Sequence, residues 1–136
     1  MSRKTDIGRQ GEFLAAYLLE RNGIECHHVN RQEADLWCKM PNGTLLPVQV
    51  KSASKPHKDP RWPTPCRYHF FSRTKENSIW VACVALDVGI VLMTAPHEPR
   101  NWIRKEMFTE YEQAQRMEQF IAFSEPSPPR GLTATG

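Results

Sequence analysis

Three polar residues in segment 33–52 have the types and the spacing to do chemistry together. Asp35 offers a carboxylate, Gln49 a neutral amide oxygen and Lys51 an ammonium group. Oxygen ligands of this kind hold hard divalent cations, and a lysine beside them can move a proton or neutralise developing charge. If the chain brings them together, they suffice for metal-assisted hydrolysis of a phosphodiester.

A tight hairpin is the expected means of bringing them together. Residues 34–40 and 44–52 are expected to form two strands. Residues 41–43, Pro-Asn-Gly, suit a type I turn with glycine in the left-handed conformation. This three-residue loop places Met40 opposite Thr44. A two-residue loop would shift the register by one residue and separate the polar groups.

The predicted register places Asp35 opposite Gln49. Because side chains alternate along a strand, Asp35, Gln49 and Lys51 then share one face of the sheet. Pro47 cannot donate to a ladder, so the second strand is expected to start irregularly or at an edge. The other face is apolar and should pack on the core; it carries Leu36, Cys38, Leu46, Val48 and Val50.

A helix is expected upstream, from a capping residue at Thr5 or Asp6 to a closing glycine at Gly23. Glu12 lies at the boundary of its apolar stripe, and the missing side chains of Gly8 and Gly11 leave space for another backbone or a nucleic-acid strand to approach it. The stripe is formed by Ile7, Gly11, Leu14, Ala15 and Leu18.

The rest of the chain predicts one α/β domain, residues 1–123, in which helices flank a central mixed β-sheet. A length of 136 residues, 40% of them hydrophobic, is enough for one buried core. The strongly apolar run 78–86 is expected to be a central strand. Other strands are expected at 24–29, 67–71 and 90–94, and helices at 101–107 and 109–123. Residues 124–136, rich in Pro, Ser, Thr and Gly, are expected to be disordered.

The net charge of +3 is unevenly distributed. Within residues 51–75 the basic residues face a single acid, Asp59, whereas residues 106–125 carry glutamates and only Arg116 as a base. A basic flank beside the polar residues suits a polyanion such as nucleic acid, and the alternative is a solvated basic loop. The residues expected to bind nucleic acid are Ser52, Lys55, Lys58, Arg61, Trp62, Arg67, Arg73 and Lys75.

Two of these assignments have alternatives. Ser52 reaches a phosphate only if its strand departs from strict alternation. Trp62 lies among the prolines and cations of segment 54–66. Its ring either stacks on nucleic-acid bases or folds back on the core.

The expected metal site combines side-chain and backbone oxygens. Asp35 would bind a divalent cation directly, the Val50 carbonyl would be a second ligand and Gln49 a weaker third. Glu12 would hold the ion through a water molecule. Lys51 would orient or deprotonate the attacking water and neutralise developing charge.

With these residues in place, the sequence resembles the PD-(D/E)XK nuclease superfamily. The matching parts are Gly-Arg-Gln-Gly-Glu at 8–12, Ala-Asp at 34–35 and Val-Gln-Val-Lys-Ser at 48–52. Within the superfamily the chain is most similar to the small Holliday-junction-resolvase-like and intron-encoded homing nucleases. The similarity covers residues 3–53 well and the later apolar strands more loosely, and it implies a restriction-endonuclease-like core.

The resemblance implies that Glu12, Asp35 and Lys51 are catalytic, with Mg²⁺ as the usual cofactor, Mn²⁺ as its substitute and DNA as the usual substrate. Ala34 stands where the superfamily commonly has proline. Gln49, which we include in the catalytic set, stands where it commonly has a second acid. Certain members, intron homing enzymes among them, carry glutamine there and still cleave. The expected activity is that of a Mg²⁺-dependent endodeoxyribonuclease.

The substrate is open to several interpretations. The leading expectation is a structure-selective enzyme of the Holliday junction resolvase type, which needs two sites and therefore a homodimer or a higher homo-oligomer. The alternatives are a site-specific homing-type endonuclease and a non-catalytic nucleic-acid-binding module that retains the nuclease fold, which Gln49 favours. A further possibility is an interaction protein that uses the Met117 and Phe120 face of its last helix.

Cysteine usage and hydropathy indicate the compartment. The four cysteines contain no CxxC pair and are expected to be reduced, buried thiols of a cytoplasmic protein. A zinc site from Cys26, His27 and His28 is disfavoured, because adjacent residues on a strand point to opposite faces. No apolar run is long enough to span a membrane, and residues 1–7 lack the apolar segment of a secretory signal.

Overall fold

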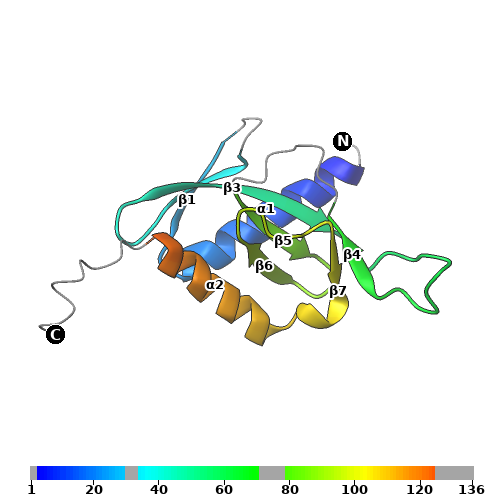
Figure 1. Ribbon diagram of the computed structural model, residues 1–136. Coiled ribbons are helices and arrows are strands. Elements are labelled where there is room, and N and C mark those ends of the chain that lie inside the picture. Colours follow the sequence, from blue (N-terminus) through cyan, green and yellow to red (C-terminus); the bar gives the residue numbers. More distant parts are fainter. Residues whose placement is uncertain (1–2, 30–33, 71–78, 125–136) are drawn as a thin grey trace, which may run out of the picture.

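The computed structural model describes residues 3–29, 34–70 and 79–124, with side chains from residue 6 onward (Figure 1). Its elements, in chain order, are α1 (Arg3–Arg21), β1 (Glu25–His28), β2 (Leu36–Lys39), β3 (Leu45–Ala53), β4 (Arg67–His69), β5 (Trp80–Ala85), β6 (Ile90–Thr94), β7 (Trp102–Arg104), the 3-10 helix η1 (Lys105–Met107) and α2 (Glu110–Ser124).

The central sheet is mixed, as the sequence predicts. Its strand order is β1-β2-β3-β5-β6, and β3 and β5 are parallel while the other neighbours are antiparallel. A separate two-stranded sheet pairs β4 with β7. The predicted α/β fold, a central mixed sheet flanked by helices, is confirmed.

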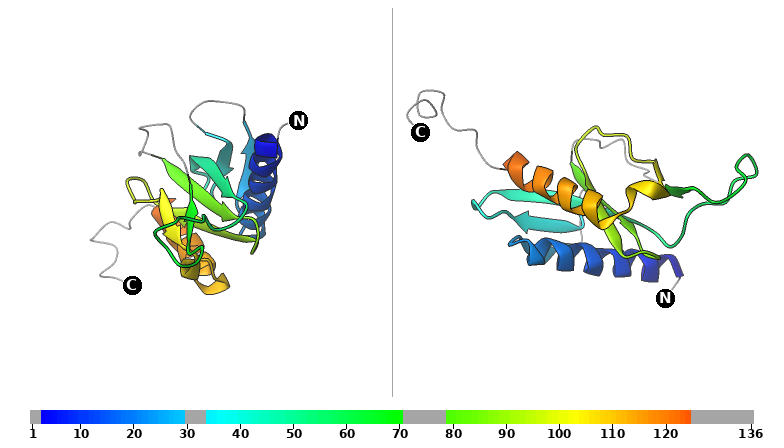
Figure 2. Two further views of the ribbon diagram at one scale, coloured as in Figure 1. Left: turned by 90° about the vertical axis from the view of Figure 1, so that its right-hand side faces the viewer. Right: turned by 90° about the horizontal axis from the view of Figure 1, so that it is seen from below.

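The two faces of the central sheet are covered differently (Figure 2). Leu19 of α1 and Phe120 of α2 pack with Val48 in one hydrophobic cluster, so both helices cover the same face. Tyr68 of β4 and Phe108, which follows η1, pack in a second cluster against the other face. Side chains on β3 therefore face either the helices or the small β4–β7 sheet, depending on their parity.

The predicted hairpin register is confirmed. The Met40 N–H donates to the Thr44 carbonyl at 2.8 Å, and Gly43 closes the turn with its φ of 91°. The ladder continues from this loop to the pair Leu36–Val48. The loop therefore contains three residues, and the register is regular as far as Leu36 and Val48. The predicted pair of Asp35 and Gln49 is not part of the ladder, because the Asp35 N–H donates to the Val48 carbonyl at 3.0 Å.

The first helix ends as predicted and begins earlier than predicted. Gly23, at a φ of 82°, donates to the Glu20 carbonyl, and Ile24 donates to the Leu19 carbonyl. These two bonds satisfy carbonyls that the last turn leaves without helical partners. The prediction of a cap at residue 5 or 6 is wrong, because the helix already includes Arg3.

The prediction of a helix at 101–107 is also wrong. Residues Trp102–Arg104 form strand β7, and only Lys105–Met107 are helical. Pairing with β4, which is distant in sequence, decides the conformation of this segment. The last helix ends at Ser124. The disordered tail is predicted to begin at residue 124, which is one residue too early. Its other residues, 125–136, lie outside the described residues.

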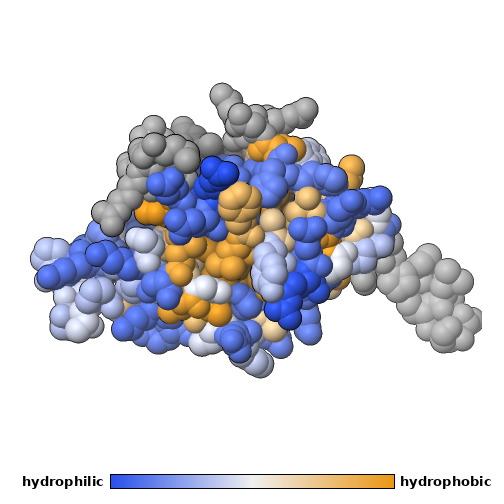
Figure 3. Space-filling view, turned by 180° about the vertical axis from the view of Figure 1, so that it is seen from behind, coloured by the Kyte–Doolittle hydropathy of each residue, from blue (hydrophilic) through white to orange (hydrophobic). Residues whose placement is uncertain are grey.

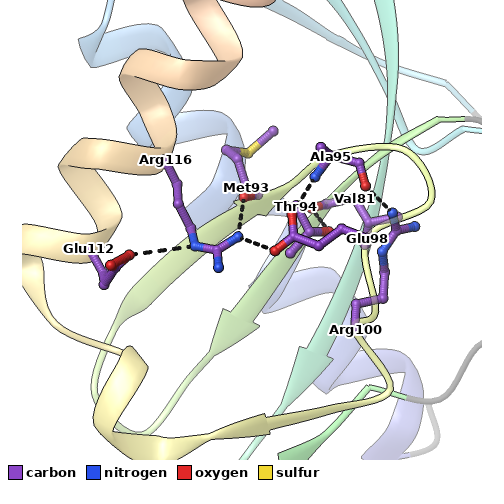
Figure 4. Close-up of polar contacts among 8 residues, drawn as sticks. All are labelled: Val81, Met93, Thr94, Ala95, Glu98, Arg100, Glu112 and Arg116. Carbon is purple, nitrogen blue, oxygen red and sulfur yellow. Dashed lines mark hydrogen bonds and ion pairs between the residues drawn. The ribbon is translucent and has the colours of Figure 1, made fainter.

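A polar network fixes the chain between β6 and β7 (Figure 4). Arg116 of α2 donates to the Met93 carbonyl at 3.2 Å and pairs with Glu98 at 2.8 Å. The other oxygen of Glu98 accepts a hydrogen bond from the Ala95 N–H at 2.9 Å. Arg100 is buried and donates to the Ala95 carbonyl. These contacts set the direction in which the chain enters β7.

Some aromatic side chains stay on the surface. Phe13 and Tyr17 on α1 are each more than half exposed, with Arg9 over the Phe13 ring at 5.5 Å and Arg21 over the Tyr17 ring at 5.7 Å. The guanidinium groups partly cover the rings.

Seen from behind, the molecule shows an apolar area bordered by hydrophilic residues (Figure 3).

The four cysteines are free thiols, of which Cys38 and Cys83 are buried and Cys26 and Cys66 are half-buried. The prediction of buried thiols thus holds for two of them. Among the described residues, no helix is both long and apolar enough to cross a membrane.

Helix α1 packs tightly against β3 at Gly11. A Cβ atom at Gly11 would lie 1.6 Å from Oγ and 2.9 Å from Cβ of Ser52. The missing side chain therefore admits strand β3. At Gly11 this decides for a backbone and against a nucleic-acid strand, whereas no atom lies within 4 Å of a Cβ at Gly8.

We expect Gly11→Ala to lower the free energy of unfolding, because its methyl group would enter the space of the Ser52 side chain and overpacking costs about 1–3 kcal/mol. Gly8→Ala is the matched control. Its methyl group would meet no atom within 4 Å, so it should stabilise the helix by up to about 1 kcal/mol. Urea unfolding measures both variants, and adding Ser52→Ala to Gly11→Ala should recover part of the loss. Equal effects at the two glycines would contradict the close contact.

Candidate active site

Strands β2 and β3 separate at Asp35, and we call this place the fork. The ladder between them ends with Leu36 and Val48, while β3 continues to Ala53 paired with β5. In a regular ladder the Val50 N–H would next bond to the Ala34 carbonyl. Instead it donates to Oδ2 of Asp35 at 2.8 Å. The carboxylate thus replaces the departing strand as the partner of this amide.

The Val50 carbonyl also points toward the fork. Along β3 the Ala53 carbonyl accepts from Leu86, so the odd-numbered backbone groups of this stretch face β5. The N–H and C=O of one residue leave an extended strand on the same edge. Val50 therefore directs both groups to the side that β2 has left. The pairing of its carbonyl with Asp35 as metal ligands stays a prediction.

Gln49 and Lys51 lie on the face opposite to the helices. Their pairing partners across the sheet, Val81 and Cys83, belong to the second hydrophobic cluster. Gln49 is 8% exposed, and Lys51 is half-buried. The predicted alternation therefore holds, with Gln49 and Lys51 on one side of β3 and Val48 and Val50 on the other.

Glu12 approaches the fork from the helix-covered side. Its side chain is 33% exposed, and its Oε1 lies 3.7 Å from Nδ1 of His28 on β1. Burial raises the pKa of the Glu12 carboxyl, and the negative charge of Asp35 raises it further, while His28 acts in the opposite direction. The two carboxylates are thus close enough to repel each other.

The residues at the fork have the donor chemistry of a hard-cation site. Among the described residues no group of three or more His, Cys, Asp and Glu could hold a metal. A cation here would therefore need the Val50 carbonyl and the Gln49 amide in addition to Asp35. The repulsion between Glu12 and Asp35 is the kind of strain that a bound cation relieves. This ligand set fits Mg²⁺ and stays a prediction.

A groove of about 800 Å³ runs along the edge of β3 that β2 leaves uncovered. Its lining contains no carboxylate, and it joins the start of α1 to the second half of β3, the loop after it and β4. The basic residues of the lining are Lys51, Lys55, His57, Lys58 and His69. The groove therefore offers a polyanion a positively charged path that includes Lys51.

The predicted nucleic-acid residues are distributed unevenly. Lys55 and Lys58 line the groove, whereas Arg73 and Lys75 lie outside the described residues. The Ser52 hydroxyl is buried without a hydrogen-bond partner and lies in the space next to Gly11. Strict alternation holds at Ser52, so the condition for its contact with a phosphate is not met.

Arg61 is engaged within its own loop. Its Nη2 and Nε donate to the two carboxylate oxygens of Asp59 at 2.8 and 3.0 Å. This pairing lowers the pKa of Asp59 to about 2. The charge of Arg61 is therefore already compensated, which weakens its expected role in binding a phosphate.

Trp62 folds back, but not onto the core. Its ring meets Trp102 of β7 edge to face at a centroid distance of 5.8 Å. The guanidinium of Arg67 lies 4.8 Å from the Trp62 ring centroid. Neither hydrophobic cluster includes Trp62. The alternative that Trp62 folds back on the core is therefore wrong, and its stacking on nucleic-acid bases stays a prediction.

The sequence interpretation did not identify several residues of this region. His28 lies beside Glu12 because α1 and β1 are packed together. His69, Trp102 and Arg104 share the small sheet. Tyr68 and Ile103 are the core-facing residues of β4 and β7. The alternation of apolar and polar residues around them could have predicted that His69, Trp102 and Arg104 point outward.

No family model matches this chain, and no curated protein matches its sequence. Among solved structures, the bacterial homing endonuclease I-Ssp6803I superimposes with a TM-score of 0.63 over 90% of this chain and 92% of that chain, at 18% sequence identity. The fold resembles that of a homing endonuclease. This similarity agrees with the expected nuclease-like core, while the PD-(D/E)XK motif assignment stays a prediction.

In the metal-free protein, Asp35→Asn should lower the pKa of Glu12, because it removes the repelling charge. His28→Ala should raise this pKa, because it removes a favourable partner. Since the folded-state pKa of Glu12 lies above its unfolded value, its contribution stabilises the fold at low pH and is lost as the pH rises through the folded pKa. Carbon-detected NMR titration of Glu12 in both variants is the measurement. Shifts in the same direction would contradict the described arrangement.

Proposed function

We propose that this protein is a metal-dependent DNA endonuclease. The observation that carries the proposal is the fork, where the Asp35 carboxylate is fixed by the Val50 amide beside Gln49 and next to the basic groove with Lys51. Acid, neutral oxygens and lysine are the groups that metal-assisted phosphodiester hydrolysis needs. The similarity to a solved homing endonuclease supports the same reaction class.

Each residue at the fork has a separate role in the proposed reaction. One oxygen of Asp35 is held by the Val50 N–H, which fixes the carboxylate and leaves its second oxygen for a cation. The Val50 carbonyl and the Gln49 amide would complete the protein ligands, and Glu12 would orient a water molecule. A divalent cation held there supplies positive charge at the phosphate and a lower pKa for a nearby water.

Lys51 acts from the groove side. Its ammonium group would hold the scissile phosphate and accept or donate a proton at the attacking water. Lys55 and Lys58 follow it along the groove lining and would hold neighbouring phosphates.

Site-specific cleavage of duplex DNA is the mode that we propose first. I-Ssp6803I is a homing endonuclease, and the similarity of fold favours this alternative over the resolvase-like reading of the sequence. A symmetric pair of subunits would present one active site to each DNA strand. We therefore propose a homodimer or a higher homo-oligomer.

Plasmid cleavage with Mg²⁺ or Mn²⁺ tests the proposed activity. Asp35→Asn and Lys51→Ala should each reduce the rate by at least about 10²-fold, because they remove the cation ligand and the charge beside the phosphate. Lys39→Ala is the matched control, since Lys39 is an exposed lysine of β2 and should leave the rate unchanged. Equal rates for Lys51→Ala and Lys39→Ala would overturn the assignment of Lys51.

The same assay on a four-way junction, a flap, duplex and single-stranded DNA distinguishes the substrate classes. Cleavage confined to branched DNA would favour the resolvase-like alternative. DNA binding without cleavage of any substrate would favour a non-catalytic module, the function that Gln49 suggests.

Gln49→Glu should bind Mn²⁺ more tightly, on the order of tenfold, because a carboxylate is a stronger ligand than an amide for a hard cation. Gln10→Glu adds the same charge to the exposed side of α1 and should leave the affinity unchanged. Isothermal titration calorimetry measures both variants. An equal effect of the two substitutions would place the ion away from Gln49.

A further inference from the structure

The small β4–β7 sheet, which we call the ribbon, has one buried and one outer face. Tyr68 and Ile103 are paired across it and belong to the second hydrophobic cluster. Their neighbours must point outward, since side chains alternate along strands. The outer face therefore carries two cross-strand pairs, Arg67 with Arg104 and His69 with Trp102.

The pair of Arg67 and Arg104 is unusual in its charge. Residues directly opposite on antiparallel strands lie close together, and like charges there are destabilising. Within the described part of the chain, neither arginine forms an ion pair with a carboxylate. Two facing and uncompensated guanidinium groups form a site for an anion with more than one negative charge.

An aromatic cluster lies beside these arginines. The Trp102 ring stacks on His69 at a centroid distance of 4.2 Å and meets His57 at 5.2 Å, yet Trp102 is 41% exposed. It belongs to neither hydrophobic cluster. The packing of the core thus does not explain this exposed tryptophan. An exposed ring beside cations suits contact with a nucleotide base or sugar.

The ribbon continues the basic groove. His57 and His69 contact Trp102 and also line the groove that contains Lys51. The chain between β3 and β4 extends from the body of the molecule next to the ribbon (Figures 1 and 2). A strand that lies in the groove with its phosphate at Lys51 would therefore reach the outer face of the ribbon.

We propose that the outer face of the ribbon is a DNA-binding surface, in which Arg67 and Arg104 hold successive phosphates and Trp102 packs against a base or sugar. The inference rests on the proposed function, because it takes DNA as the ligand. It extends the nucleic-acid contacts beyond the loop to Arg104 and Trp102. The charge of the facing arginines decides the chemistry of the partner, a polyanion.

Fluorescence anisotropy with a labelled duplex in EDTA, at several salt concentrations, tests this surface without cleavage. Arg104→Gln should weaken binding and reduce the slope of log K against log salt by about 0.9, the value for one lost phosphate contact. Arg104→Lys keeps the charge and should keep the slope. Arg21→Gln is the matched control, since Arg21 is also an exposed arginine and belongs to α1.

Trp102→Ala should weaken binding about fivefold or more without a change of slope, whereas Trp102→Phe should retain most of the affinity. Thermal unfolding of each variant shows whether it is folded. Unchanged affinity and slope in folded Arg104→Gln and Trp102→Ala, with DNA binding and cleavage retained, would overturn this inference alone. Absence of DNA binding in the wild type would overturn the proposed function as well.

Discussion

The hydrogen bond from the Val50 N–H to the Asp35 carboxylate is the contact on which the candidate site depends. It replaces a ladder bond at the point where β2 leaves β3. A bare amide there would be costly, because a buried donor without a partner loses its hydration. The carboxylate satisfies that amide, and the same bond fixes one oxygen of the acid at the edge of the sheet.

The departure of β2 has two consequences for the surface. It leaves the Val50 carbonyl without a β2 partner, and it uncovers the edge of β3 along which the basic groove runs. Both faces of the sheet meet at this edge. Glu12 can therefore approach from the helix side while Lys51 lines the groove. The departure of β2 from β3 thus places the acidic residues and the lysine in neighbouring positions, but on different sides of the sheet edge.

The second face depends on a different set of contacts. Arg116 and Glu98 tie α2 to the end of β6, and the buried Arg100 holds the turn that follows. The chain then enters β7 in a fixed direction and can pair with β4. The core holds this ribbon through Tyr68 and Ile103, so its polar residues are left on the outer side. The side chains of Arg67 and Arg104 stay close together because the strands that carry them are packed on the core through Tyr68 and Ile103.

Sequence alone determined the local features whose causes are local. The Pro-Asn-Gly loop at 41–43 set the hairpin register as far as the pair Leu36–Val48, and alternation along β3 put Lys51 on the face of Gln49. Gly23 ended the first helix, because only a residue that tolerates a positive φ closes it in this way. Each of these features depends on residues a few positions apart.

Tertiary structure decided the features that need partners distant in sequence. The approach of His28 to Glu12 requires the packing of α1 on β1, and strand β7 exists because β4 lies beside it. Segment 101–107 has no strong local preference, so propensity predicted a helix where pairing imposed a strand. The Asp35 carboxylate likewise turned to the Val50 amide because β2 departs there. Neighbouring residues fix a turn, but only the assembled sheet shows which backbone groups lack a partner.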